Sequence, residues 1–286
     1  MNRKPEDWTV LSMLEWATDY FKSKNIPDPR HSIEWLLAET LDVKRLDLYL
    51  QFDRPLSPSE LDRLRPLVKR RAGHEPLQYI TGFSDFMNAR ISVTPDVLIP
   101  RIETEQLVEL ILARHTDEKL SVLDIGTGSG CIPIALKMEH PHWQLSAIDI
   151  SEKALSLARE NARQNESEIN FSEGDILSPE AIHFDELFDV IVSNPPYITP
   201  DEKEILEPQV REFEPHTALF FDDIEMMYKK IIEFALSNLS KSGSLYLELH
   251  EHYSSEILAL FDDEKWDSRI SEDYDKKPRF IIAARI

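Results

Sequence analysis

The chain has 286 residues, of which 42% are hydrophobic and 30% charged, and its 53 acidic and 32 basic residues give a formal net charge of −21. This length and composition are those of a globular protein with two domains or one large one. Because binding to nucleic-acid phosphates depends on lysine and arginine, so acidic a chain argues against a non-specific grip on DNA or RNA.

Other classes of protein are excluded by features that the sequence lacks. It contains no run of about 18 apolar residues that could span a membrane, and no apolar segment follows the basic residues at its start as in a signal peptide. Its single cysteine, Cys131, excludes an intramolecular disulfide framework and a cysteine-based zinc cluster. We therefore expect a cytoplasmic, monomeric protein without a metal site or membrane association, in which Cys131 is a buried apolar residue.

Residues 1–82 predict a small all-helical domain. Apolar residues recur at helical spacing after Thr9, a candidate N-cap. Asp28 followed by a proline is typical of the start of a second helix. The segment from Ser57 to Glu60 predicts a third, with a capping box and a proline at the first helical position.

Residues 83–99 predict a hairpin or extended linker, because the helical period stops there and residues 89–93 alternate as in a strand. From residue 100 to residue 286, strand and helix patterns follow one another. This alternation predicts an α/β domain whose doubly wound, mostly parallel sheet carries helices on both faces. The candidate strands are 121–125, 144–150, 169–174, 189–193, 244–249 and 279–284, and helical patterns lie between them, such as 154–162 and 224–239.

The first of these strands runs through Asp124 and Ile125 into the glycine loop Gly126-Thr127-Gly128, and a helix follows. Glycines allow a ligand to lie close to the amides of a helix start. The G-x-G-x-G spacing departs from the G-x-G-x-x-G of dinucleotide sites. Asp124 would repel a pyrophosphate, whereas it suits the sulfonium and amino groups of S-adenosylmethionine. The loop therefore predicts a site for this cofactor, and the alternative is a tight turn with solvated acids.

Acidic residues at the ends of the next two strands extend the predicted site. Asp149 lies about 20 residues past the loop, where a carboxylate can accept hydrogen bonds from both hydroxyls of a ribose. Asp175 follows the third strand and could reach the adenine amino group, with Ile176 packed on the adenine face. A Gly-Asp pair at a strand end is also a common turn, so Asp175 and Ile176 are the weaker part of this hypothesis.

The fourth strand ends in Asn194-Pro195-Pro196-Tyr197, which indicates the chemistry. The Asn194 side-chain oxygen and the Pro195 carbonyl can accept both hydrogens of a planar NH₂ group, and the Tyr197 ring can stack on its flat face. The paired prolines, Pro195 and Pro196, hold the backbone rigid. Because the lone pair of an amide nitrogen is delocalised, orienting that nitrogen toward the methyl carbon is the main contribution expected of the tetrapeptide.

With these two motifs the sequence resembles the release factor glutamine methyltransferases (the HemK or PrmC family) over nearly its full length. The resemblance includes three further segments: HEPLQYITG at 74–82, LIPRIETE at 98–105 and FEP at 213–215. The sequence departs from the family pattern at Phe221-Asp222-Asp223, where a glycine pair is common, and at Glu248-Leu249-His250, where Glu-Ile-Gly is common. Neither departure is expected to touch the reacting atoms.

The resemblance implies N5-methylation of the glutamine in the Gly-Gly-Gln motif of peptide chain release factors. It implies that the helical domain, residues 1–82, grips this protein substrate, and that residues 100–286 form the S-adenosylmethionine-dependent methyltransferase domain. It also implies that residues 100–105 lie near the methionine end of the cofactor.

Three other functions remain open at this point. Ribosomal-protein glutamine methylation and adenine-N6 methylation of DNA present the same kind of planar NH₂ group to the tetrapeptide. A DNA enzyme would also need a basic cleft and a means of flipping the base, so the acidic charge weighs against it. A non-enzymatic binding module would show damage to the loop or the tetrapeptide, and neither motif is damaged.

Overall fold

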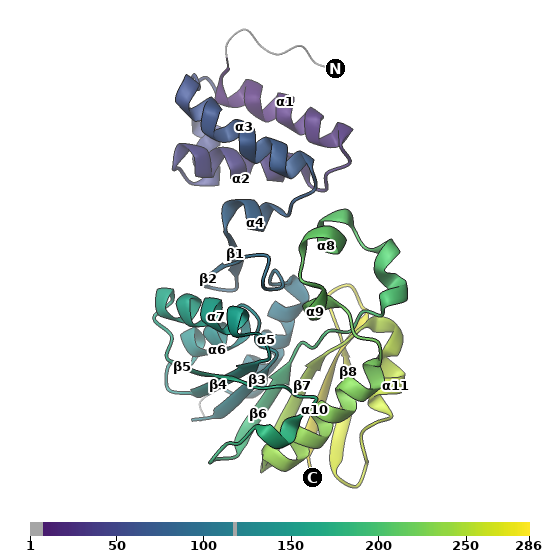
Figure 1. Ribbon diagram of the computed structural model, residues 1–286. Coiled ribbons are helices and arrows are strands. Elements are labelled where there is room, and N and C mark those ends of the chain that lie inside the picture. Colours follow the sequence, from purple (N-terminus) through teal and green to yellow (C-terminus); the bar gives the residue numbers. More distant parts are fainter. Residues whose placement is uncertain (1–7, 117–118) are drawn as a thin grey trace. The chain divides into compact units, whose positions relative to one another are not determined.

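The computed structural model describes residues 8–116 and 119–286, which form two compact units (Figure 1). One unit contains the described residues up to Gly82 together with Glu207–Phe213. The other contains the described residues of Phe83–Leu206 and of Glu214–Ile286. The segment Glu207–Phe213 therefore belongs to the helical unit, although it lies far from that unit in the sequence.

The first unit is all-helical. Two of its helices begin as predicted, with Thr9 and Ser57 each closing a reciprocal capping box, Thr9 with Ser12 and Ser57 with Glu60. Its core is apolar and fully buried around residues such as Phe21. Its elements are α1 (Val10–Ser23), α2 (Pro29–Leu41), η1 (Arg45–Leu50), α3 (Pro58–Ala72), α4 (Leu77–Thr81) and α8 (Pro208–Phe213).

Asp28 stands at the N-cap of α2 and Pro29 follows at the first helical position, as the sequence predicts, but the Asp28 side chain does not cap the helix. Asp28 has a left-handed backbone with φ 46°, and its side chain makes no capping bond within the described chain. Side-chain capping requires an extended backbone at this position. The backbone carbonyl of Asp28 accepts the Ser32 amide at 2.9 Å instead, so the backbone alone starts the helix.

The second unit is built on a hairpin and a mixed sheet. The strands β1 (Phe83–Phe86) and β2 (Ala89–Ser92) pair antiparallel, so the alternation in this region indicated a hairpin correctly. Within the described residues the sheet has the order β5-β4-β3-β6-β7-β9-β8, parallel from β5 to β7 and antiparallel beyond. Its strands are β3 (Ser121–Ile125), β4 (Gln144–Asp149), β5 (Ile169–Glu173), β6 (Phe188–Ser193), β7 (Leu239–Glu248), β8 (Trp266–Glu272) and β9 (Pro278–Arg285).

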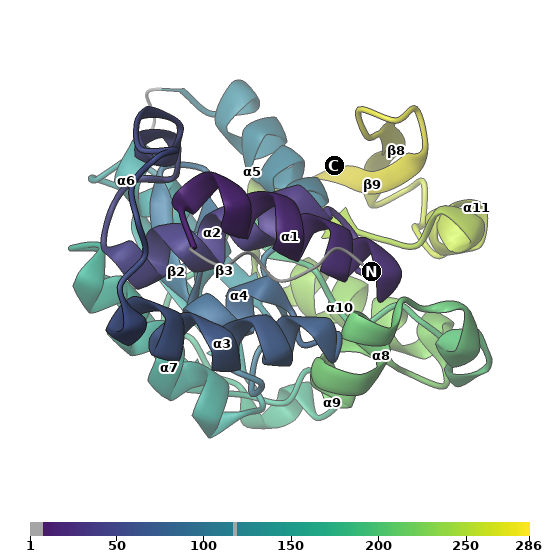
Figure 2. The same cartoon turned by 90° about the horizontal axis from the view of Figure 1, so that it is seen from above.

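Helices cover both faces of this sheet, so the predicted fold class is confirmed. The helices α5, α6 and α7 lie on one face, and α10 and α11 on the other (Figure 1). Figure 2 shows β8 and β9 side by side at the antiparallel end, next to α11. The helices are α5 (Ile102–Arg114), α6 (Cys131–Glu139), α7 (Glu152–Gln164), α9 (His216–Leu219), α10 (Ile224–Asn238) and α11 (Ser254–Leu258), with short turns η2 (Pro179–Ala181), η3 (Pro200–Ile205) and η4 (Glu251–Tyr253).

Candidate active site

The five parallel strands place the predicted motifs along one edge of the sheet. Because β5, β4, β3, β6 and β7 run in the same direction, their carboxyl ends lie side by side, which is where ligands bind in such folds. A cavity of about 350 Å³ opens at this edge. Of the predicted site residues it is lined by Ile125, Gly126, Thr127, Gly128, Asp149, Asp175, Ile176, Asn194, Pro195 and Pro196.

The glycine loop turns sharply from β3 into α6. Gly126, Gly128 and Gly130 all have positive φ, a backbone conformation that residues other than glycine rarely adopt. A Cβ at Gly130 would also lie 3.1 Å from the Cβ of Ala158 on α7. The loop therefore keeps α6 close to α7 and leaves the backbone exposed to the cavity.

Asp149 is fixed at the end of β4 by this loop. One carboxylate oxygen accepts the Gly128 amide at 2.8 Å, and the other accepts the Ser151 amide at 2.9 Å. Burial raises the pKa of Asp149, while the amides of Ser151 and Gly128 oppose that rise. The carboxylate is thus held rigidly on the cavity wall, with lone pairs left for a ligand.

We expect Asp149→Ala to weaken binding of S-adenosylhomocysteine by about 1.5–3 kcal/mol, the range for losing charge-assisted hydrogen bonds. Isothermal titration calorimetry measures this change. Asp96→Ala is a suitable control, because Asp96 lies at the rim of the same cavity and its carboxylate is paired with Lys153. An affinity for Asp149→Ala equal to that of the wild type would contradict the assignment of Asp149.

Asp124 does not itself line the cavity, but its carboxylate lies next to the hydroxyl of Thr127, which does. It is 1% exposed, and among the described residues neither its carboxylate oxygens nor the Thr127 hydroxyl has a hydrogen-bond partner of normal geometry. Burial, and secondarily the charge of Asp149, raises the pKa of Asp124 to about 7, although the nearby Thr127 hydroxyl acts in the opposite direction. Buried polar atoms without partners are costly. These atoms therefore fit a ligand that brings positive charge or hydrogen-bond donors.

The tetrapeptide after β6 is linked to two residues that the sequence did not single out. The Asn194 side-chain nitrogen donates to the Thr104 hydroxyl at 3.0 Å, and that hydroxyl donates to the Glu248 carboxylate at 2.8 Å. The Tyr197 hydroxyl donates to the other oxygen of Glu248 at 3.1 Å. Tyr197 does not line the cavity. Thr104 and Glu248 were missed because their importance lies in contacts across 144 residues, although both stand in the segments compared with the family pattern.

One departure from the family pattern borders this site, because Phe221 lines the cavity. The other departure, Leu249-His250, directly follows Glu248, which agrees with the family pattern and is connected to Asn194 through Thr104. Glu248 is fully buried, and this burial raises its pKa to about 7, against the hydrogen bonds from Thr104 and Tyr197.

The segment before α5 is tied to the FEP segment. Arg101 donates to one carboxylate oxygen of Glu214 at 2.5 Å, and the Ile99 amide donates to the other at 3.2 Å. Glu214 is buried, so the ion pair is shielded from water. The nearby Glu105 accepts the amide of Met87 at 2.8 Å and so supports the turn between β1 and β2. Pro100, Arg101 and Thr104 line the cavity, and the proximity of residues 100–105 to the methionine end of the cofactor stays a prediction.

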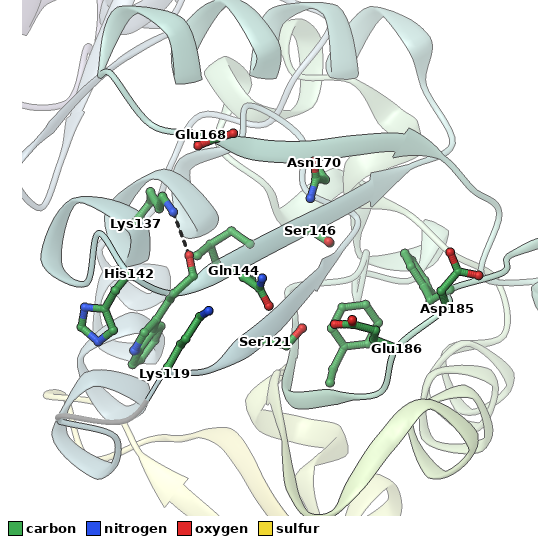
Figure 3. Close-up of a pocket in the computed structure, with 14 residues that line it drawn as sticks. Lys119, Ser121, Lys137, His142, Gln144, Ser146, Glu168, Asn170, Asp185 and Glu186 are labelled. Atoms are coloured by element: carbon green, nitrogen blue, oxygen red, sulfur yellow. Dashed lines mark hydrogen bonds between the residues drawn. The ribbon is translucent and has the colours of Figure 1, made fainter.

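A second cavity lies at the opposite ends of the strands (Figure 3). Its volume is about 500 Å³, and Ser121 and Gln144, the first residues of β3 and β4, line it. Charged residues of both signs surround it, among them Lys119 and Glu186. None of the predicted site residues lines it, so the smaller cavity at the carboxyl edge is the candidate active site.

The described residues contain neither a membrane-spanning helix nor a cluster of metal ligands. No helix in residues 8–116 or 119–286 is both long and apolar enough to cross a membrane. In the same part of the chain no three histidine, cysteine, aspartate or glutamate residues are grouped so as to hold a metal ion.

Comparisons with known proteins place the chain in a class. Residues 12–82 match the family described as PrmC N-terminal domain, and residues 103–212 match the Methyltransferase small domain. The fold is shared with the hMettl16 catalytic domain in complex with the MAT2A 3'UTR hairpin 1 (TM-score 0.52, 19% identity, 79% of each chain). It is also shared with a methyltransferase from Pyrococcus furiosus (TM-score 0.50, 16% identity, 79% of this chain and 98% of that one). The sheet order, the loop and these matches define an S-adenosylmethionine-dependent methyltransferase.

Curated relatives narrow the class to one family. The release factor glutamine methyltransferase of Geobacter sulfurreducens is 42% identical over 263 residues, which cover 91% of this chain and 91% of that protein. The release factor glutamine methyltransferase of Leptospira interrogans is 36% identical over 97% of this chain and 98% of its own. The chain belongs to the release factor glutamine methyltransferase family.

Proposed function

We propose that this chain transfers the methyl group of S-adenosylmethionine to the side-chain amide nitrogen (N5) of the glutamine in the Gly-Gly-Gln motif of peptide chain release factors. In this reaction the methyl carbon leaves the sulfonium sulfur, which becomes a thioether, and bonds to the amide nitrogen, which loses a proton. The observation that supports this function best is the position of Asn194 and Pro195 on the wall of the cavity that also holds the glycine loop.

The cofactor site combines groups of suitable chemistry. Asp149, Asp175 and Ile176 line the cavity, where Asp149 would accept from the ribose hydroxyls and Asp175 with Ile176 would hold the adenine. The carboxylate of Asp124, which is unpaired among the described residues, fits the positive charge of the cofactor, because that charge would offset the free-energy cost of burying the carboxylate.

The substrate amide would be held by the tetrapeptide. The side-chain nitrogen of Asn194 donates a hydrogen bond to Thr104, so the side-chain oxygen of Asn194 is left to accept one hydrogen of the substrate amide. The Pro195 carbonyl would accept the second hydrogen. Together these acceptors orient the nitrogen and stabilise positive charge that grows on it. Stacking of the Tyr197 ring on the amide stays a prediction.

We further propose that residues 1–82 grip the release factor, because a three-residue motif alone offers far less than the roughly 1,200 Å² that stable interfaces bury. The substrate is then a protein, and the net charge of −21 disfavours direct binding to nucleic acid. A release factor substrate also places the enzyme in the cytoplasm, where translation ends.

The experiment offers three substrates side by side: a release factor, the same factor with the Gly-Gly-Gln glutamine changed to alanine, and duplex DNA containing adenine. We expect methyl transfer to the intact factor alone, detected by mass spectrometry as one added methyl group on that glutamine. A ribosomal protein rich in glutamine serves as a fourth substrate. Transfer to the alanine variant, the DNA or the ribosomal protein, with none to the intact factor, would overturn the proposal.

A further inference from the structure

The side chain of an asparagine can present either its oxygen or its nitrogen to a substrate, and only one of these suits an NH₂ group. The oxygen accepts a hydrogen bond, whereas the nitrogen would point two more hydrogens at those of the substrate. Because the two ends of the amide have nearly the same shape, packing alone does not select between them. Some polar neighbour must therefore determine which end of Asn194 faces the cavity.

The chain of hydrogen bonds behind Asn194 makes this selection. In its ionised form the Glu248 carboxylate only accepts hydrogen bonds, so above its pKa of about 7 the single hydrogen of the Thr104 hydroxyl is directed to it at 2.8 Å. The Thr104 oxygen is then left as an acceptor, and the Asn194 nitrogen donates to it at 3.0 Å. Tyr197, donating to the second oxygen of Glu248 at 3.1 Å, keeps the carboxylate in place.

The burial of these groups makes the selection strong. Thr104 is 3% exposed and Glu248 is 0% exposed, so water does not offer either of them another partner. Rotating the Asn194 amide by half a turn would place its oxygen against the Thr104 oxygen, and neither would then have a hydrogen for the other. In a buried site such an unmade hydrogen bond costs on the order of 1–3 kcal/mol.

We propose that Thr104 and Glu248 are positioning residues that hold the side-chain oxygen of Asn194 toward the substrate amide. This inference rests on the proposed function, because it assumes that the substrate presents an NH₂ group. Neither residue needs to touch the reacting atoms. Thr104 acts through Asn194, and Glu248 acts through Thr104.

The first test is Thr104→Val, which keeps the shape of the side chain and removes its hydroxyl. We expect kcat on the release factor to fall about 10- to 100-fold, the size of effect that misorientation of a reacting group produces. The affinity for S-adenosylhomocysteine should stay within about threefold, since the hydroxyl is assigned to substrate orientation. Thr104→Ser should restore most of the activity. The control is Ser244→Ala, which removes another buried hydroxyl that belongs to β7. This control should leave kcat unchanged.

A double-mutant cycle separates positioning from packing. If Thr104 acts through Asn194, Thr104→Val should cost less than about twofold when Asn194 is already alanine. Equal losses of kcat in the two backgrounds would overturn the proposal. The proposal would also be overturned if Thr104→Val lowered the affinity for S-adenosylhomocysteine as much as it lowered kcat. A kcat of Thr104→Ser as low as that of Thr104→Val would overturn it as well.

A further measurement does not depend on turnover. The side-chain NH₂ signal of Asn194 in the ¹⁵N-labelled protein, identified by its loss in Asn194→Ala, should shift in Thr104→Val and return in Thr104→Ser. An unchanged signal in Thr104→Val would overturn the positioning role. If the wild-type enzyme left the release factor unmethylated while this signal shifted, the proposed substrate would be wrong and the role of Thr104 would stand.

Discussion

Asn194→Ala is expected to lower kcat on a release factor by at least about 10²-fold, as the loss of one oriented polar group does in other active sites. The reason is that Asn194 supplies an acceptor that matters most once the substrate nitrogen points at the methyl carbon. The affinity for S-adenosylhomocysteine should change by less than about threefold, because binding of the cofactor is distributed over many other residues. Single-turnover kinetics and calorimetry give the two quantities.

A control for this variant is Asn170→Ala. Asn170 lies on β5 and lines the second cavity at the opposite edge of the sheet (Figure 3). It should therefore keep the wild-type kcat. If Asn194→Ala turned over within about threefold of the wild type, Asn194 would not be the group that orients the substrate amide.

The parallel core of the sheet was predictable from the sequence, because its strands are buried and apolar on both faces. Residues 121–125 were predicted as a strand, and they form β3 with four of its five residues buried. The edge strand β8, Trp266–Glu272, was missed. Its residues are mostly polar and only Trp266 is fully buried, so its sequence lacks the apolar pattern of a core strand.

In the helical unit, the missed features are polar contacts. Glu34 of α2, which no sequence motif marks, is 2% exposed and accepts hydrogen bonds from Arg30, Arg45 and Tyr49. Burial alone would raise the pKa of Glu34, but these bonds hold it below the usual range. Periodicity records which residues are apolar, so it does not reveal a buried acid whose partners come from elsewhere in the chain.

In the candidate site, too, some residues were predictable from the strand pattern and others were not. Asp149, Asp175 and Asn194 were found because each lies at or just after the carboxyl end of a parallel strand, and these ends meet at one edge of the sheet. Thr104 and Glu248 belong to α5 and β7, and only the folded sheet brings them together. The sequence could thus identify groups that face a ligand, whereas the groups that orient them depend on packing.

The buried Asp124 carboxylate, which has no hydrogen-bond partner of normal geometry in residues 8–116 or 119–286, predicts opposite effects on stability and on cofactor binding. In the unfolded chain this carboxyl ionises near its ordinary pKa of 3.8, whereas burial raises the pKa to about 7 in the folded protein. The unfolded state therefore holds the negative charge more easily, so ionisation of Asp124 destabilises the fold. The loss of stability begins as pH rises above 3.8, is complete above about 7, and amounts to at most about 4 kcal/mol.

We accordingly expect ligand-free Asp124→Asn to be more stable than the wild type at pH 8, with a smaller gain at pH 5, because asparagine has the same shape without the charge. Urea denaturation at both pH values measures the difference in free energy of unfolding between the variant and the wild type. The contributions of the other titrating groups are the same in both proteins and cancel in this difference. The affinity for S-adenosylhomocysteine should meanwhile fall at least about tenfold, since the variant removes a buried negative charge beside the cavity that would attract the cationic amino group. Asp273→Asn is the control of opposite sign: amide and Arg279 hydrogen bonds hold the pKa of Asp273 low despite its burial, so its replacement should destabilise the protein at pH 8. The proposed role of Asp124 in cofactor binding would be wrong if Asp124→Asn were less stable than the wild type at pH 8, or if its affinity for S-adenosylhomocysteine were unchanged.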